Sequence, residues 1–234
     1  MATIDALKGP TLMPAGGKPA TSAVVLLHGY GSNGDDLIGL APFFARALPD
    51  TAFYSPNAPQ MLEGGFMGGF QWFSLATYDP DMMRRDPNRM ADTFKSFRVG
   101  TTASAVKLDA YIDQILAHHN LEPDKLALLG FSQGTMMSLH VGPRREKQIA
   151  GVLGYSGALT GADALAAEIK TKPPVALVHG DADAVVPYPA MAAAEQALKA
   201  VGIACETHTV RGLQHGIDGE GAAFGAAFLK RVLA

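Results

Sequence analysis

The sequence predicts an α/β fold in which a mostly parallel central sheet is covered by helices on both faces. The main observation is that short apolar runs alternate with helical patterns along the chain, and strands that alternate with helices typically form parallel sheets. The composition agrees, because 48% of the 234 residues are hydrophobic and 18% are charged, enough for a large core. We expect a single domain over residues 1–234, since α/β folds often reach this length undivided.

Five runs are predicted to be strands. Four of them are continuously apolar, as expected of strands that are buried on both faces of a sheet. They cover residues 23–27, 125–130, 149–154 and 175–179. The fifth run, residues 204–210, alternates apolar and polar side chains and is therefore predicted to be an edge strand.

Helical periodicity separates these runs. Apolar residues recur at spacings of three and four over residues 35–48 and 101–118. A proline begins the segment 189–200 and a glycine follows it, which is the usual punctuation of a helix, and residues 220–233 are predicted to form the last helix. Residues 57–98 show neither pattern. We predict a long lid-like loop there, since loops of this length in compact domains are usually functional; the alternative is a poorly ordered insertion.

Charge and composition exclude several classes of protein. The net charge of −3 gives no broad basic surface, so no nucleic-acid partner is expected. A single cysteine, Cys205, can form neither an intramolecular disulfide nor a cysteine-based zinc site. No apolar run approaches the ~20 residues that cross a bilayer, and the N-terminus lacks the pattern of a signal peptide. We therefore expect a cytoplasmic protein without an integral membrane segment, as a monomer or homodimer.

The strongest local motif is the G-x-S-x-G pattern at residues 130–134, with Ser132 at its centre. It follows a predicted buried strand and precedes a helical stretch at residues 135–141, which is the setting of a nucleophile elbow. Such a turn needs glycines because side chains beside the serine would collide with the neighbouring backbone. Ser132 would then lie at the carboxyl end of its strand, the edge at which parallel sheets bind ligands.

A serine hydroxyl needs a base before it can act as a nucleophile, and His215 is the best candidate. It lies in the glycine-flanked loop 212–216 just after the last predicted strand, whereas local packing or capping explains the other six histidines. The carboxylate that orients such a base should follow an intervening strand. Asp181 and Asp183 both lie in a suitable loop at residues 179–187, and spacing does not choose between them.

Two backbone amides are candidates for an oxyanion hole. The Gln133 N–H directly follows the serine and is the first of them. The second is expected from the glycine-rich loop 28–34, where we choose the Tyr30 N–H. That loop lacks the lysine and the spacing of a phosphate-binding P-loop.

Taken together, these motifs resemble the phospholipase/carboxylesterase family of α/β-hydrolases, which includes the acyl-protein thioesterases and small bacterial carboxylesterases. The resemblance runs from about residue 22 to the end of the chain. It is carried by residues 27–31, 55–59, 72–73, 130–134, 156–157 and 179–187, followed by His215. It implies an α/β-hydrolase fold, with Ser132 as nucleophile and His215 as base. It also implies Asp183, rather than Asp181, as the partner of the base, with oxyanion donors at Tyr30 and Gln133.

The activity implied by the resemblance is that of a serine carboxylesterase. It would hydrolyse short-to-medium acyl esters, or thioesters or lysophospholipids, through an acyl-enzyme and without a cofactor or metal. Its partner would be a small-molecule acyl ester or thioester. The alternative is a non-catalytic relative that binds a small molecule in the same pocket. That alternative predicts a damaged triad or a blocked elbow, and the sequence has neither.

The family's acyl pocket is bordered by the stretch equivalent to residues 61–73. Phe66, Met67, Phe70 and Trp72 are therefore predicted to form an apolar wall that moves on neighbouring glycines. The alternative is that Trp72 anchors this stretch in the core.

Two departures from the family pattern stand out. Thr135 replaces a third glycine that many relatives have, which should affect packing below the elbow more than chemistry. Residues 74–98 are longer and more charged than in the compact thioesterases, which leaves the substrate open.

Overall fold

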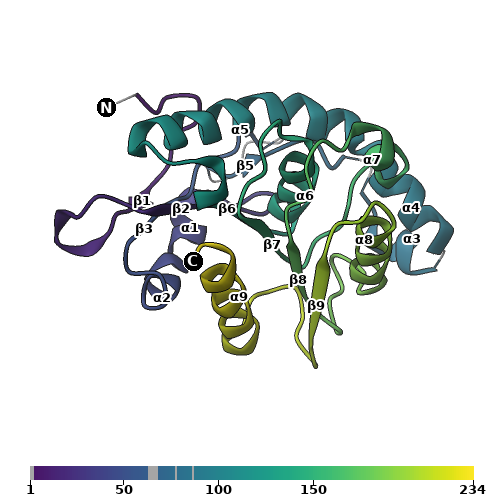
Figure 1. Cartoon of the computed structure of the whole chain (residues 1–234). Coiled ribbons are helices and arrows are strands. Elements are labelled where there is room, and N and C mark those ends of the chain that lie inside the picture. The colour runs from purple at the N-terminus through teal and green to yellow at the C-terminus, as the bar shows by residue number, and fades with distance from the viewer. Residues whose placement is uncertain (1–2, 63–67, 77, 86) are drawn as a thin grey trace.

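The computed structural model describes residues 3–62, 68–76, 78–85 and 87–234 (Figure 1). Within these residues a seven-stranded sheet has the order β1-β3-β2-β6-β7-β8-β9. β1 pairs antiparallel with β3, and all the other neighbours pair parallel. The strands are β1 (Thr11–Leu12), β2 (Ser22–Leu27), β3 (Thr51–Tyr54), β6 (Leu126–Phe131), β7 (Gly151–Tyr155), β8 (Val175–Gly180) and β9 (Cys205–Val210). The predicted α/β-hydrolase fold is confirmed, and β9 lies at the sheet edge as predicted.

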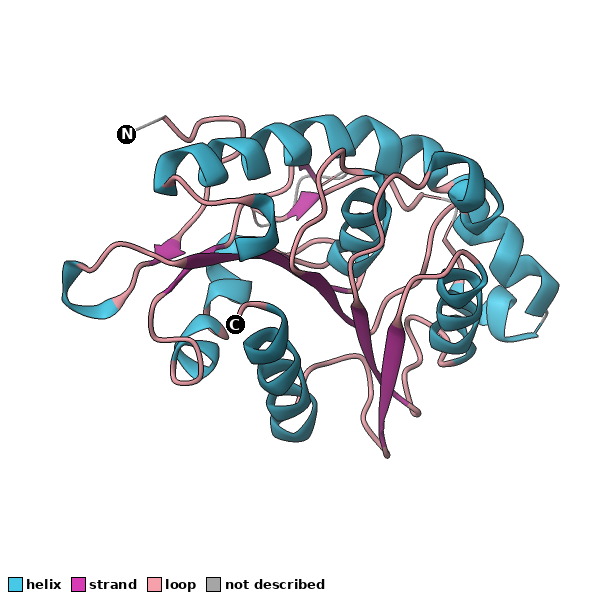
Figure 2. Ribbon diagram, viewed as in Figure 1, coloured by secondary structure: helices cyan, strands magenta, loops and turns pink. Residues whose placement is uncertain are grey.

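Helices cover both faces of the sheet (Figure 2). Side chains alternate along β2, so that Val25 and Leu27 lie in one hydrophobic cluster. Val24 and Leu26 lie in the cluster on the other face. The first cluster is covered by α5 (Arg98–His119), α6 (Gln133–Val141), α7 (Ala162–Glu168) and α8 (Pro189–Ala200). The second is covered by α1 (Gly34–Ile38), α2 (Ala41–Ala45) and α9 (Gly219–Val232).

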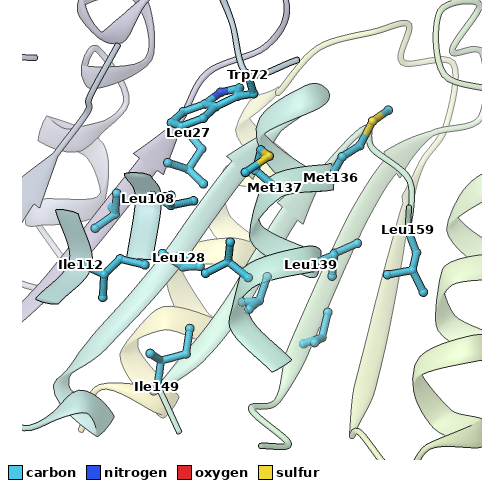
Figure 3. Packing of buried hydrophobic residues seen from close by; sticks show 14 of the residues in the cluster. Leu27, Trp72, Leu108, Ile112, Leu128, Met136, Met137, Leu139, Ile149 and Leu159 are labelled. Atoms are coloured by element: carbon cyan, nitrogen blue, oxygen red, sulfur yellow. The ribbon is translucent and has the colours of Figure 1, made fainter. Parts of the chain in front are cut away.

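The larger cluster lies between the sheet and the helices α5 and α6. Figure 3 shows sheet residues such as Leu27 and Leu128 packed among side chains from these helices, including Ile112 and Leu139. Trp72 lies at the same end of this cluster as Leu27. These side chains are fully buried, which is why the four apolar runs could be recognised as strands.

Residues 57–98 are not the loop without regular structure that the sequence predicts, and that expectation was wrong for much of the segment. A two-stranded antiparallel pair, β4 (Gln60–Met61) and β5 (Phe70–Gln71), precedes two helices, α3 (Pro80–Arg85) and α4 (Pro87–Ser96). Both helices begin at a proline, a residue that is favoured in the first turn of a helix because it lacks an N–H. We call the described residues between 57 and 98 the cover, and the Tyr78 hydroxyl of this segment donates to the Val185 carbonyl in the loop after β8.

Other boundaries also differ from those predicted. The single helix expected over residues 35–48 is divided into α1 and α2, with Gly39 at the end of α1 and Pro42 in the first turn of α2. The strands β1 and β3 and the helix α7 were not predicted, and all three are short. Three short 3-10 helices complete the described elements: η1 (Ala15–Gly17), η2 (Pro123–Lys125) and η3 (Gly142–Arg144).

Candidate active site

Ser132 lies in a sharp turn between the end of β6 and the start of α6. Its backbone has φ 55° and ψ −116°, a conformation that is strained for a residue with a side chain. The turn is held by the Ser132 N–H, which donates to the Tyr155 carbonyl of β7 at 2.9 Å. A strained serine between a strand and a helix is the geometry expected of a nucleophile elbow.

The two glycines of the motif let backbone pack directly against backbone. A Cβ on Gly134 would lie 1.8 Å from the carbonyl oxygen of Leu27 in β2. A Cβ on Gly130 would lie 2.4 Å from the carbonyl group of Gly134. Neither position therefore accepts a side chain, and the shape of the turn is fixed by close contacts with the surrounding backbone.

Thr135 occupies the place of the third glycine and is accommodated by other glycines. Its hydroxyl lies 2.8 Å from the carbonyl oxygens of both Gly130 and Tyr155. A Cβ on Gly154 would come within 2.5 Å of Thr135 Cγ2, and one on Gly157 within 2.3 Å of Thr135 Cβ. The departure from the family pattern thus affects packing beneath the elbow, and Thr135 forms part of that packing.

Asp183 lies in the loop after β8 and is almost completely buried. Its Oδ1 accepts hydrogen bonds from the N–H groups of Val185 and Val186, at 2.8 and 2.9 Å. Its Oδ2 lies 2.8 Å from Nδ1 of His215 and 3.3 Å from Nε2 of His179. Burial alone would raise the pKa of this carboxyl, but the hydrogen bonds from His179 and His215 outweigh it and hold the pKa well below its usual range. Asp183 is therefore a buried carboxylate that is hydrogen-bonded to the His215 ring.

Asp181 has a different environment, although spacing alone left the two carboxylates as alternatives. Its Oδ1 accepts a hydrogen bond from the Gly212 N–H at 2.6 Å, and its backbone N–H donates to the Val210 carbonyl. Asp181 thus joins the loops that follow β8 and β9. Asp183 lies in the same loop as Asp181, and it is the carboxylate of Asp183 that contacts His215.

Ser132 and His215 line one cavity of about 330 Å³ at the carboxyl edge of the sheet. The His215 ring packs at a tilt against the Phe131 ring, with 4.9 Å between their centroids. Gly29 and Tyr30 form another part of the lining. The remaining wall is largely apolar and consists of Leu75, Tyr78, Phe131, Met136, Val185 and Val186. The cavity therefore combines a hydroxyl, an oriented imidazole and a hydrophobic surface.

The two candidate oxyanion amides lie in the segments that follow β2 and β6. Gln133 is the first residue of α6, so its N–H has no acceptor within the helix. Tyr30 lies in a turn in which the Ser32 N–H donates to the Gly29 carbonyl at 3.2 Å, and its side chain is partly exposed at the cavity. Both amides follow strands that are neighbours in the sheet.

The predicted apolar wall is placed differently from the expectation. Trp72 is fully buried in the core, and its indole N–H donates to the His28 carbonyl at 3.0 Å. Phe70 is half-buried in β5, and neither residue lines the cavity. The other two predicted wall residues, Phe66 and Met67, lie outside the described residues. The alternative, that Trp72 anchors this stretch in the core, fits its position.

The apolar residues that line the cavity were not predicted from the sequence. Val185 and Val186 lie two and three residues after Asp183, so their position in the same loop was a usable signal. Leu75 and Tyr78 belong to the cover, and their place at the cavity depends on how that segment packs. No local pattern identifies them.

The described part of the chain offers neither a metal site nor a membrane-spanning helix. No three His, Cys, Asp or Glu side chains come together there in a way that could hold a metal ion. None of the helices in those residues combines the length and the apolar character that a membrane crossing requires.

Comparison with known proteins identifies the family. The phospholipase/carboxylesterase family model matches residues 11–233. The crystal structure of esterase PE8 has a TM-score of 0.85 and 37% sequence identity, over 97% of this chain and 99% of that one. Acyl-protein thioesterase 1 of Schizosaccharomyces pombe is 28% identical over 207 residues, 86% of this chain and 86% of that protein. Esterase YpfH of Escherichia coli is 26% identical over 214 residues, 91% of this chain and 84% of that protein. The chain therefore belongs to the phospholipase/carboxylesterase family of α/β-hydrolases and is a serine hydrolase that acts on ester bonds.

Proposed function

We propose that the protein is a carboxylesterase that hydrolyses short-to-medium acyl esters with Ser132, His215 and Asp183 as its catalytic triad. The observation that carries this proposal is the 2.8 Å contact between His215 Nδ1 and Asp183 Oδ2, beside a cavity that His215 shares with Ser132. The strained backbone of Ser132 supports it further, because strain of this kind is typical of a nucleophile elbow.

In the proposed mechanism each residue of the triad has a separate role in activating the serine. Asp183 accepts the Nδ1–H of His215, which fixes the tautomer and leaves the Nε2 lone pair for the serine proton. Ser132 Oγ attacks the acyl carbonyl carbon while Nε2 takes the hydroxyl proton. The resulting imidazolium is stabilised by the buried Asp183 carboxylate, whose low pKa keeps it ionised.

The tetrahedral intermediate carries its negative charge on the former carbonyl oxygen. The amides of Tyr30 and Gln133 would donate to that oxygen, and the N-terminus of α6 favours the charge. The intermediate collapses when His215 returns the proton to the leaving alcohol. Water then attacks the acyl-enzyme with His215 again as base, and the carboxylic acid and a free Ser132 are released.

The cavity wall suggests where the acyl chain lies. Leu75, Met136 and Val186 offer an apolar surface beside Ser132. Each methylene buried against such a surface contributes about 0.8 kcal/mol until the cavity is filled. We therefore expect kcat/KM to rise over short acyl chains and then to fall. Thioesters and lysophospholipids are the other substrate classes to test, and several relatives are named acyl-protein thioesterases.

The test is fluorophosphonate labelling of the wild type, Ser132→Ala and Ser138→Ala. The reagent should label the wild type, and Ser132→Ala should lose the label and about 10⁶-fold in kcat, because triad members act as a unit. Ser138 is the matched control, since it is a buried serine in α6 whose hydroxyl donates to the Gly134 carbonyl. An unlabelled wild type would favour the non-catalytic binding protein, and a tenth of the activity remaining in Ser132→Ala would refute the mechanism.

Substrate class is resolved by a panel of oxygen esters and thioesters from acetyl to dodecanoyl, with lysophospholipids included. The proposal expects the highest kcat/KM among short-to-medium oxygen esters. A maximum at dodecanoyl thioester or lysophospholipid would change the substrate class and leave the triad in place.

A further inference from the structure

Residues 70–73 contact both halves of the proposed oxyanion hole, and we call this segment the brace. We infer that the brace sets the separation of the two amides, and that the Gln133 side chain is the positioning residue through which it acts. The inference rests on the function proposed above. It concerns the side chain of Gln133, whereas the proposed oxyanion donor is its backbone N–H.

The sheet itself stops short of both amides. The paired residues of β2 and β6 end at Leu27 and Gly130. Tyr30 and Gln133 each lie three residues beyond this pair, in loops that leave the sheet. Oxyanion donors must lie within a few tenths of an ångström of their proper positions, so the separation of these loops needs a further constraint.

The brace holds the loop at residues 28–32 through three hydrogen bonds. The Gly31 N–H donates to the Phe70 carbonyl at 2.9 Å, and the Phe70 N–H donates to the Ser32 carbonyl at 2.8 Å. The indole N–H of Trp72 donates to the His28 carbonyl at 3.0 Å. These contacts lie on both sides of Tyr30 along the chain, so they restrain the peptide that carries its N–H.

The brace holds the elbow through the side-chain amide of Gln133. Its Oε1 accepts a hydrogen bond from the Trp72 N–H at 2.8 Å, and its Nε2 donates to the Phe73 carbonyl at 2.7 Å. Gln133 and Trp72 are fully buried, so water cannot replace these bonds. One residue thus carries a proposed oxyanion donor on its backbone and is tied by its side chain to the segment that restrains the other.

The brace is also attached to a third element. The Ser104 hydroxyl of α5 donates to the Trp72 carbonyl. The backbone of Trp72 is therefore bonded to α5 through its carbonyl and to Gln133 of the elbow through its N–H. Its indole is bonded to the loop at residues 28–32. A segment fixed at these points can act as a spacer between the loops rather than follow either of them.

The experiment compares Gln133→Met with the wild type. Methionine has a similar length, keeps the backbone N–H and removes both side-chain hydrogen bonds. We expect kcat per fluorophosphonate-titrated site to fall about 10- to 100-fold, less than the ~10²–10³-fold loss when an oxyanion donor is removed outright. KM should change less than about threefold, because the oxyanion forms after substrate binding. The Ki of a trifluoromethyl ketone, which forms a tetrahedral adduct with the serine, should rise by the same factor as kcat falls.

Gln114→Met is the matched control. Gln114 Oε1 accepts hydrogen bonds from the N–H groups of Asp5 and Ala6, both at 2.9 Å, so this glutamine also ties two distant segments together. It lies in α5 and does not line the cavity. Its replacement should lower the melting temperature and leave kcat and the ketone Ki unchanged.

Trp72→Phe keeps the brace testable if Gln133→Met does not fold. It keeps an aromatic ring and both bonds to Gln133, and it loses the bond to the His28 carbonyl together with part of the indole's packing, so kcat should fall roughly three- to tenfold with unchanged KM. If the folded variants keep the wild-type kcat per active site, with only the melting temperature lowered, the brace has no positioning role. A wild type that neither labels nor hydrolyses esters would instead overturn the proposed function, and this inference with it.

Discussion

The carboxyl edge of the sheet and the cover are built in different ways. At the edge, backbone meets backbone, as where Gly134 packs against the Leu27 carbonyl. The second half of the cover, with α3 and α4, is held by side chains. The Tyr78 hydroxyl donates to the Val185 carbonyl at 2.5 Å, and Phe97 packs against Phe73 and Tyr78 with ring centroids 5.6 and 6.0 Å apart.

This difference separates the reaction from the choice of substrate. Backbone packing at the edge tolerates almost no change, since one added methyl at residue 134 would collide with a carbonyl oxygen. Side-chain contacts in the cover can be replaced one at a time. We therefore expect substitutions that disturb the backbone packing of the edge to slow the reaction for all substrates, and substitutions in the second half of the cover to alter which substrates are preferred.

The largest expected effect of a single substitution at the edge, after loss of the serine, is that of Asp183→Asn. An amide in this position favours the wrong tautomer of His215, so kcat/KM should fall by about 10⁴-fold. Asp181→Asn removes a carboxylate that bonds only to the loop at Gly212, and its loss should stay below about tenfold. Steady-state kinetics with one short ester measures both variants, and the reverse ranking would reassign the orienting carboxylate to Asp181.

Trp72→Ala tests the junction between edge and cover. Truncation of a fully buried tryptophan should lower the free energy of unfolding by about 3–5 kcal/mol. Because Trp72 does not line the cavity, kcat should fall alike for acyl chains of all lengths. Urea unfolding followed by circular dichroism and the ester panel measure the two effects. A maximum shifted toward longer acyl chains would return Trp72 to the substrate wall.

The stability of the fold should also respond to acid through His140, a buried residue in the last turn of α6. Burial and the nearby Arg144 charge lower its pKa from 6.5 to about 4. The unfolded state therefore binds the proton first as the pH falls, and stability is lost between pH 6.5 and 4. The full shift corresponds to about 3 kcal/mol.

Urea unfolding of the wild type and His140→Gln over this pH range measures the effect. The stability difference between the two proteins should change by about 3 kcal/mol between pH 6.5 and 4 and stay constant above pH 7. A pH-independent difference would show that His140 is not the group responsible.

The smallest expected effect lies in the cover, with Tyr78→Phe. Loss of the hydroxyl removes the bond to the Val185 carbonyl and about 1 kcal/mol of support for that side of the cavity. KM should rise roughly fivefold for the longest esters that the enzyme accepts, with little change for acetyl esters or in kcat. An equal loss of kcat/KM for every ester would show that Tyr78 supports the reaction itself, and would contradict the proposed difference between edge and cover.

The edge was also the more predictable region from sequence. Fully buried strands need continuous apolar residues, which is why β2, β6, β7 and β8 were found within two residues of their ends. Ser132 and Asp183 follow two of these strands and His215 follows the edge strand β9, so the topology of a parallel sheet predicts their proximity. Their roles stay predictions until the variants are measured.

The cover was less predictable because its structure depends on tertiary contacts. Met90, Phe94 and Phe97 have helical spacing in and just after α4, so a signal was present, but Pro87 and the charged residues around it obscured it. Trp72 was predicted to face substrate because its neighbours are apolar and glycine-rich. In the structure its position is instead fixed by hydrogen bonds to His28 and Gln133, which are distant in sequence and could not be read from the local pattern.

The packing of Thr135 against Gly154 restricts which residues these two positions can hold together. A Cβ on Gly154 would meet Thr135 Cγ2 at 2.5 Å, whereas its nearest neighbour outside Thr135 is Leu177 Cδ2 at 3.1 Å. Alanine at 154 is therefore blocked while residue 135 is threonine and becomes accessible once residue 135 is glycine. In the same way, a side chain at residue 154 excludes threonine from residue 135 as long as the backbone keeps this spacing. The two positions are therefore coupled, and a side chain can enter residue 154 only where residue 135 lacks the Cγ2 group.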